Sequence, residues 1–305
     1  MPELLPPPAR AVVVVAPHAD DETLGCGGTM ALWRRAGVPV RVVVLSDGAA
    51  AAPTVGMEPT RLVALRESEA TAAAAILGIP EPSFLRLPDG RLAEHRFRIG
   101  SEVERLVREM GADLVLAPSP TDYHPDHLAA AEACFAVFAG GGFALGLYEV
   151  YGTTRFNVLV DITEVQEVKE RALGAYQHGF LGAPEVFVEA NRGLARFRSF
   201  HARRQGYFEA FWHLPRFTGE DQLVNWILGG LAMPDPAAAL LSKLRATDAL
   251  LAEVGRLAEQ LAARDGEIAA LRAQLEAITT SRGWRALDRF RRVRGRLLPR
   301  RGGGR

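Results

Sequence analysis

Cysteine, lysine and long apolar runs are scarce in this sequence of 305 residues. The two cysteines, Cys26 and Cys134, are too few for the disulfide framework of a small secreted protein. The apolar stretches at 11–17 and 223–234 are too short to span a bilayer, and residues 1–10 lack the apolar core of a signal peptide. We therefore expect a cytoplasmic protein.

Charge is distributed unevenly along the chain, although the formal net charge is zero. Residues 282–305 hold ten arginines and one aspartate, so this tail carries +9 and residues 1–281 carry −9. A basic tail on an acidic body suggests that the tail has an anionic partner of its own.

Residues 1–233 alternate between strand and helix patterns and predict one domain. Residues 11–16 (AVVVVA) are a continuous β-branched run, which is typical of a strand buried on both faces. Strand patterns recur at 40–45, 83–87, 113–117 and 157–160, and helical patterns occur at 29–36, 60–77, 100–110 and 164–176. This alternation predicts an α/β fold with a Rossmann-like, mainly parallel sheet and helices on both faces.

A cluster of acids and one imidazole follows the first predicted strand, in the sequence APHADDE. His18, Asp20 and Asp21 come just past the carboxyl end of this strand, where open α/β sheets bind ligands. A divalent cation would relieve the repulsion between the crowded carboxylates, and nitrogen with oxygen donors suits Zn²⁺. The alternative is a solvated acidic turn.

The glycines after this cluster allow a second interpretation. Gly25, Gly27 and Gly28, with Asp47 about twenty residues further on, partly match a dinucleotide-binding fingerprint. The third glycine position falls on Met30, however. We therefore favour glycines that let the backbone turn tightly and a helix start pack against the sheet.

A second polar cluster, in the sequence TDYHPDH, follows the strand predicted at 113–117. It contains His124, Asp126 and His127. If this strand neighbours the first, both clusters face the same crevice. One imidazole can then bind a metal while the other transfers protons. The alternative is a pair of surface histidines in a polar loop.

The two motifs together resemble those of the PIG-L/LmbE-like family of zinc-dependent N-acetylglucosaminide de-N-acetylases. PHADDE followed by GCGGT, and HPDH followed by LAA, carry the resemblance, which covers about residues 11–215. RESEATAAAAILGI, LPDGRL and FEAF add softer matches. Ala19 replaces the usual proline of the first motif, and His178-Gly179 replaces a Ser-Gln pair.

The resemblance implies a role for each residue of the two motifs. It implies that His18, Asp21 and His127 hold the zinc and that Asp20 is the general base. It further implies that His124 stabilises the oxyanion or protonates the leaving amine.

Three more residues receive roles from the same resemblance. Asp126 is then the partner of His124, while Arg66 and Asp89 help to bind the sugar.

The implied activity is metal-dependent removal of the N-acetyl group from an N-acetylated amino sugar, releasing acetate and a free amine. Two histidines and one carboxylate also match Fe²⁺ oxygenase sites, so Fe²⁺ is the alternative metal. The spare carboxylate favours hydrolysis over oxygenation. A hydrolase of a non-sugar amide and a non-catalytic scaffold that acts through its C-terminal helix are the alternative functions.

The chain changes character after Pro234 and Pro236, which mark a hinge. Steps of four and three residues in alternation form the a/d seam of a coiled coil, which we predict at 238–281. The seam, interrupted by the polar Arg264, consists of Leu250, Val254, Leu257, Leu261, Arg264, Ile268, Leu271, Leu275 and Ile278. We expect a homo-oligomer, as a parallel dimer or trimer. An amphipathic helix folded back on the body is the alternative.

Residues 282–305 predict a basic amphipathic tail. We expect it to bind an anionic membrane surface, which would place the protein peripherally on the inner face of the membrane. Nucleic acid is the rival partner, and the apolar Trp284, Phe290 and Leu297 favour lipid over it. The coiled coil followed by TTSRGWR resembles tails of bacterial glycosyltransferases of surface-polysaccharide assembly, which implies a cell-envelope glycan or its precursor as substrate.

Overall fold

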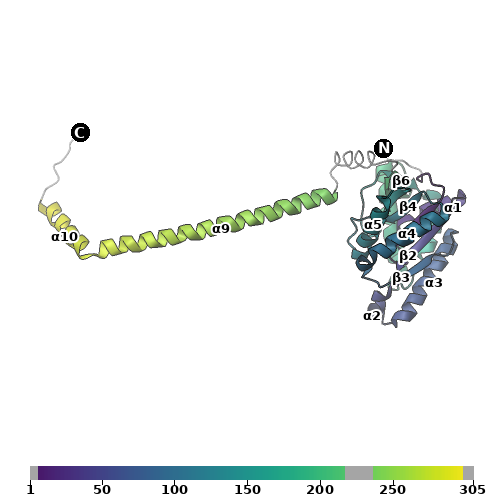
Figure 1. Ribbon diagram of the computed structural model, residues 1–305, viewed down its shortest axis with the longest axis horizontal. Coiled ribbons are helices and arrows are strands. Elements are labelled where there is room, and N and C mark those ends of the chain that lie inside the picture. The colour runs from purple at the N-terminus through teal and green to yellow at the C-terminus, as the bar shows by residue number, and fades with distance from the viewer. Residues whose placement is uncertain (1–5, 217–235, 298–305) are drawn as a thin grey trace. The chain divides into compact units, whose positions relative to one another are not determined.

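The computed structural model describes residues 6–216 and 236–297, and the side chains of 254–294 within the second range. The chain divides into two compact units, Met1–Leu228 and Gly229–Arg305. The described elements of the first unit (Figure 1) are β1 Val12–Ala16, α1 Asp21–Arg35, β2 Val40–Ser46, α2 Ala52–Val55, α3 Pro59–Leu77, β3 Ser83–Leu87, α4 Arg96–Met110, β4 Leu114–Pro118, α5 Pro125–Phe138, β5 Ala144–Tyr148, β6 Val158–Asp161, α6 Gln166–Leu173, α7 Pro184–Ala202 and β7 Phe208–Leu214.

The first unit is built on a seven-stranded sheet with the order β3-β2-β1-β4-β5-β7-β6. The strands from β3 to β5 pair in parallel, and β7 runs antiparallel to both β5 and β6. The predicted α/β class with a mainly parallel sheet is therefore confirmed. β1 pairs directly with β4 in register Val12↔Leu114, so the carboxyl ends of these two strands meet at one edge of the sheet.

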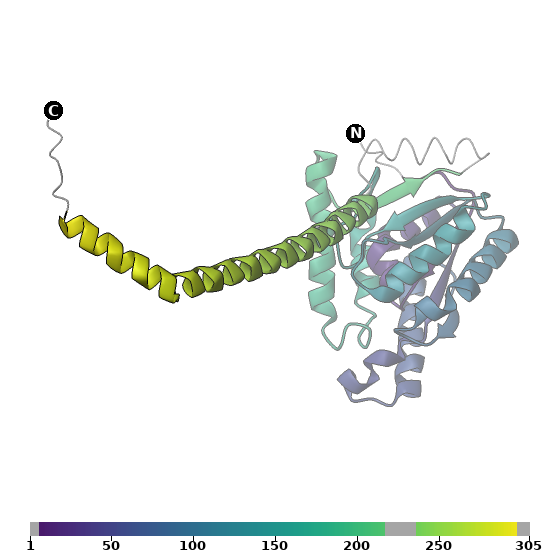
Figure 2. The same ribbon diagram turned by 60° about the vertical axis from the view of Figure 1, so that its left-hand side comes forward.

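Helices cover both faces of the sheet (Figures 1 and 2). Along β1, Val12 and Val14 pack on the side of α1, α3, α6 and α7, whereas Val13 and Val15 pack on the side of α4 and α5. Every residue of β1 is buried, which explains why its β-branched run is continuous rather than alternating.

The first helix begins earlier than the sequence suggested. α1 starts at Asp21 and has non-helical φ and ψ at Cys26, and Glu209 accepts hydrogen bonds from the backbone N–H groups of Gly28 and Thr29. A Cβ at Gly25 would lie 2.1 Å from the Tyr148 ring, so the close approach of this helix to the sheet requires glycine there.

Other differences lie at the far side of the sheet and at helix starts. The sequence patterns did not predict α2, α5, α7, β5 or β7, and α4 begins at Arg96 rather than at residue 100. β7 carries the buried Glu209 as its second residue, and this charge obscured the strand pattern. β7 lies between β5 and β6 and pairs antiparallel with both, so it does not follow the strand–helix–strand rhythm of the parallel strands.

The second unit contains two described helices, α9 Pro236–Thr280 and α10 Arg282–Leu297. Figure 2 shows the chain bending between these two helices. Ser281 lies between them, and its hydroxyl accepts a hydrogen bond from the backbone N–H of Trp284. Seam residues of α9 such as Leu261, Leu271 and Leu275 are more than 60% exposed. The predicted long helix is present, and its pairing with another helix stays a prediction. The side chains of Leu250 and Leu297 lie outside the described residues.

No helix among the described residues combines the length and the apolar character needed to cross a membrane.

Candidate metal centre and active site

The two predicted clusters meet at the carboxyl edge of β1 and β4. His18 and Asp20 lie between β1 and α1, and Asp21 is the first residue of α1. His124 is the N-cap of α5, and His127 lies in the first turn of that helix. Asp20 has a φ of 140°, a strained conformation of the kind that clusters at functional sites.

Asp21 lies at the centre of the cluster. Its Oδ2 accepts a hydrogen bond from the backbone N–H of His18 at 2.8 Å and lies 3.2 Å from Nδ1 of His18. Nε2 of His127 lies 3.2 Å from the same oxygen. The structure thus brings His18, Asp21 and His127, the three predicted ligands, together around one point.

A second carboxylate lies behind the far nitrogen of each imidazole. Nε2 of His18 is 3.1 Å from Oδ1 of Asp89 and 3.5 Å from Oδ2 of Asp126. Nδ1 of His127 is 3.3 Å from Oδ2 of Asp122. Carboxylates in these positions orient a ligating histidine and fix which nitrogen carries the proton.

His124 lies beside the other two imidazoles, and its nitrogens have different environments. Donor atoms of His18, His124 and His127 lie within 4.8 Å of one another. Nδ1 of His124 accepts a hydrogen bond from the backbone N–H of Asp126, however, so in the neutral ring Nε2 carries the proton. Burial and the neighbouring His18 and His127 lower the pKa of His124, which keeps the ring neutral. With Nδ1 occupied and Nε2 protonated, the His124 ring is better suited to donate a hydrogen bond than to bind a metal ion.

The donor set fits a divalent metal ion. Asp20 Oδ1 and Asp21 Oδ1 are buried and have no hydrogen-bond partner within the described part of the chain, and the two ring nitrogens of His127 lie near carboxylates without hydrogen-bond geometry. Burial lowers the pKa of His127, but Asp21 and Asp122 outweigh burial and raise this pKa to about 9. A metal ion would satisfy the orphaned donor atoms, and imidazole with carboxylate donors is a set that zinc accepts.

Asp20 lies next to this set in a different environment. Burial and the neighbouring charge of Asp21 raise the pKa of Asp20 to about 8, whereas Arg66 and His18 oppose this rise. Arg66 donates a hydrogen bond to Oδ2 of Asp20 at 3.3 Å. A Cβ at Gly179 would lie 2.8 Å from the same oxygen, so a glycine is needed beside this carboxylate.

The remaining predicted residues have contacts that the motifs did not foretell. The Asp126 carboxylate accepts hydrogen bonds from the backbone N–H groups of Gly90 and Leu92, and it faces His18 rather than its expected partner His124. Asp89 contacts His18, as described above. The predicted contacts of Arg66 and Asp89 with a sugar stay predictions.

Sequence reasoning gave no role to Asp122 and Tyr151. Asp122 stands in the quoted TDYHPDH motif and also accepts a hydrogen bond from the backbone N–H of Tyr151. The Tyr151 ring stacks on His127 with centroids 5.4 Å apart and an angle of 22°. Asp122 could have been found from the sequence, because it lies in the same motif as His124 and His127. Tyr151 could not, because it follows β5, which no sequence pattern predicted.

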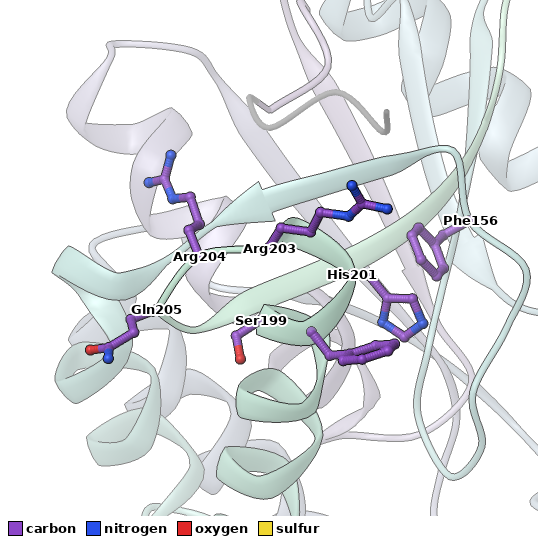
Figure 3. Close-up of a pocket in the computed structure, with 7 residues that line it drawn as sticks. Phe156, Ser199, His201, Arg203, Arg204 and Gln205 are labelled. Carbon is purple, nitrogen blue, oxygen red and sulfur yellow. The ribbon is translucent and has the colours of Figure 1, made fainter.

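A surface pocket of about 890 Å³ lies away from the two polar clusters, beside the edge strand β6 (Figure 3). Its lining includes His201, whose ring lies 5.0 Å from Phe156 and 5.4 Å from Phe200. Arg204 also lines this pocket and pairs with Asp161. Neither of the polar clusters predicted from the sequence reaches it.

Comparison with known proteins shows which family this chain is similar to. The family model of the GlcNAc-PI de-N-acetylases, PIG-L, matches residues 13–138, a range that contains both polar clusters. The diacetylchitobiose deacetylase of Thermococcus kodakarensis is 28% identical over 189 residues, which cover 56% of this chain and 70% of that protein.

Two further proteins show the same similarity. A probable N-acetyl-alpha-D-glucosaminyl L-malate deacetylase of Bacillus anthracis is 34% identical over 130 residues, covering 41% of this chain and 57% of its own length. The structure of N,N'-diacetylchitobiose deacetylase from Pyrococcus horikoshii superimposes with a TM-score of 0.59 at 25% identity, covering 68% of this chain and 84% of that one.

Proposed function

Because this chain belongs to the PIG-L family through its domain at 13–138, we propose that it is a metal-dependent N-deacetylase of N-acetylated amino sugars. The observation that carries the proposal is the convergence of His18, Asp21 and His127 beside a separate carboxylate, Asp20. Relatives named as deacetylases of acetylated sugars support the substrate class.

We assign His18, Asp21 and His127 to the metal, with zinc as the proposed ion and Fe²⁺ as the alternative. When bound, the ion would polarise the amide carbonyl and lower the pKa of water. Asp89 and Asp126 behind His18, and Asp122 behind His127, would keep the other ring nitrogens protonated and the rings in place.

The remaining residues carry the proton transfers. Asp20 takes a proton from the attacking water, because its buried carboxylate lies next to the donor set without belonging to it. Burial raises the pKa of Asp20, and a cation held by Asp21 would lower this pKa and favour the ionised carboxylate. Nε2–H of His124 donates a hydrogen bond to the amide oxygen as negative charge develops there. Asp20 or His124 then supplies the proton that the departing sugar amine needs, and the products are acetate and a free amine.

Acetate release by the zinc-loaded protein tests this function. Incubation with N-acetylglucosamine glycosides should remove one acetyl group per sugar, measured as a mass loss of the glycan and as free acetate. Release from simple N-acetylated amines but not from sugars would favour the alternative non-sugar amide hydrolase. Absence of turnover in every metal-loaded form would favour the scaffold.

We also propose the finer assignments of substrate and place. A cell-envelope glycan or its precursor is the proposed substrate, and the cytoplasm, at the inner face of the membrane, is the proposed location. The exposed seam of α9 supports self-association as a parallel dimer or trimer. The arginine-rich α10 with its apolar Trp284 and Phe290 supports an anionic membrane partner rather than nucleic acid.

A further inference from the structure

A cavity of about 330 Å³ lies at the same edge of the sheet as the candidate metal centre. Leu24 of α1 and the segment 150–153 after β5 form part of its wall. Val186, Phe187 and Leu194 of α7 form the rest, together with Ala190 and Asn191. Its volume is within the range of pockets that bind small molecules.

This cavity shares its wall with the catalytic cluster. Tyr151 lines it and also stacks on His127, and its backbone N–H donates to Asp122, the carboxylate behind His127. Leu24 lines it as well, and its backbone N–H donates to the carbonyl of Asp20 at 2.9 Å. Tyr151 therefore belongs both to the wall of the cavity and to the contacts of His127, a proposed metal ligand.

The chemistry of the lining selects a neutral, mainly apolar group. None of the described lining residues is charged, and most are aliphatic or aromatic. A phosphate there would lose its hydration without gaining a cation.

A buried hydrogen bond joins the two sides of this wall. Asn191 of α7 is 7% exposed, and its Nδ2 donates to the carbonyl of Leu24 in α1 at 2.9 Å. The two helices that line the cavity are therefore held together beside the candidate metal centre.

We propose that this cavity binds an apolar aglycone of the sugar substrate. The inference rests on the proposed deacetylase function and names the class of its substrate. The reacting acetyl group must lie at the metal donors, so a group beyond Tyr151 is joined to it through the sugar ring. The site therefore distinguishes an alkyl or aryl glycoside from a sugar 1-phosphate.

Turnover by the zinc-loaded full chain tests this substrate class. We expect kcat/KM for octyl N-acetylglucosaminide to exceed that for free N-acetylglucosamine and for its 1-phosphate at least tenfold. Ala190→Trp fills the cavity and should bring the octyl-to-free-sugar ratio close to one, and Val186→Trp should act in the same direction. Ala75→Trp, on the exposed side of α3, is the matched control and should keep the ratio.

Each contrary result has a separate meaning. An equal kcat/KM for all three sugars, or a preference for the phosphate or for a long N-acyl chain, would overturn the aglycone proposal. A failure to deacetylate any sugar would instead contradict the proposed function. In that case octyl glucoside, which has no acetyl group, tests the cavity by calorimetry: binding that Ala190→Trp abolishes supports the cavity, and absence of binding overturns it.

Discussion

Each ligating imidazole of the candidate centre has one nitrogen toward Asp21 and the other toward a further carboxylate. The motifs predicted which side chains converge, because residues that follow neighbouring parallel strands meet at one edge. They did not predict the carboxylate behind each ring. The Asp89–His18 contact joins segments 71 residues apart, and no local spacing encodes such a contact.

The proposed role of Asp20 as the proton acceptor can be tested separately from the proposed metal ligands. Asp20→Asn keeps the shape of the side chain and should lower acetate release about 100-fold or more, because the water loses its base. Zinc content, measured by metal analysis of the purified protein, should stay unchanged. His18→Ala should instead lose the metal together with the activity. Full turnover by Asp20→Asn would refute the assignment of the base.

Asp89 offers a test of whether it acts on His18 or on the sugar. Asp89→Asn removes the charge 3.1 Å from Nε2 of His18 and should weaken zinc binding about 10–100-fold in a chelator competition. Asp113→Asn removes an aspartate that pairs with Arg10 before β4, and it should leave zinc affinity unchanged. If Asp89→Asn raises KM and leaves zinc affinity intact, Asp89 contacts only the sugar.

Helices and strands could be predicted where their residues keep one pattern, either apolar and β-branched or helix-forming, over most of their length. β1 and β4 have continuous buried apolar runs, β2 has one interrupted only by Arg41, β3 is bounded by turn residues, and α3 consists mainly of helix formers, so their bounds were predicted within one or two residues. The first half of α1 could not be predicted, since its glycines suit close packing against Tyr148 and Ile162 inside a helix as well as a turn before one. The burial of Glu209 in β7 depends on partners from α1 and α6.

Those partners of Glu209 make a buried network that connects β7 to the helices. Glu209 accepts hydrogen bonds from Lys169 at 2.7 Å and from the backbone and hydroxyl of Thr29. Glu209→Gln leaves the Lys169 charge buried without its counter-ion, so the free energy of unfolding should fall by about 3–5 kcal/mol in a denaturant titration.

Glu94→Gln is the control for this measurement. Glu94 forms an exposed pair with Arg91, and such pairs contribute less than about 1 kcal/mol. Equal losses for Glu209→Gln and Glu94→Gln would show that the buried network does not hold β7 against α1.

Arg264 interrupts the seam of α9 at a d position and tests whether the seam is buried against another helix. If it is, Arg264→Leu removes a charge from the interface and should tighten self-association about tenfold or more, measured by analytical ultracentrifugation. Glu259→Leu, at an outward position of the same helix, should leave the association constant unchanged. A chain that stays monomeric with either residue at 264 would contradict the coiled coil.

At the scale of the whole molecule, the chain combines an acidic body with a cationic C-terminus. Residues 282–305 carry +9 against −9 for the rest, so an anionic surface attracts the tail and repels the body. In α10 the apolar Trp284, Phe290 and Val293 are between 41% and 64% exposed, which leaves them available for insertion between lipid headgroups. Charge and apolar contact would then act together.

Vesicle flotation of the full chain and of the chain ending at residue 281 separates these contributions. The full chain should float with vesicles that contain anionic lipid and not with neutral ones, and rising salt should weaken this binding. The truncated chain should stay in solution and retain acetate release from a soluble glycoside, because both polar clusters lie within 11–215.

Substituting Trp284→Ser and Phe290→Ser together should weaken flotation of the full chain, because these changes remove apolar contact with the lipid and keep the charge of the tail. Equal flotation of full and truncated chains would exclude the tail as the membrane contact, and tail-dependent capture of RNA without flotation would identify nucleic acid as its partner.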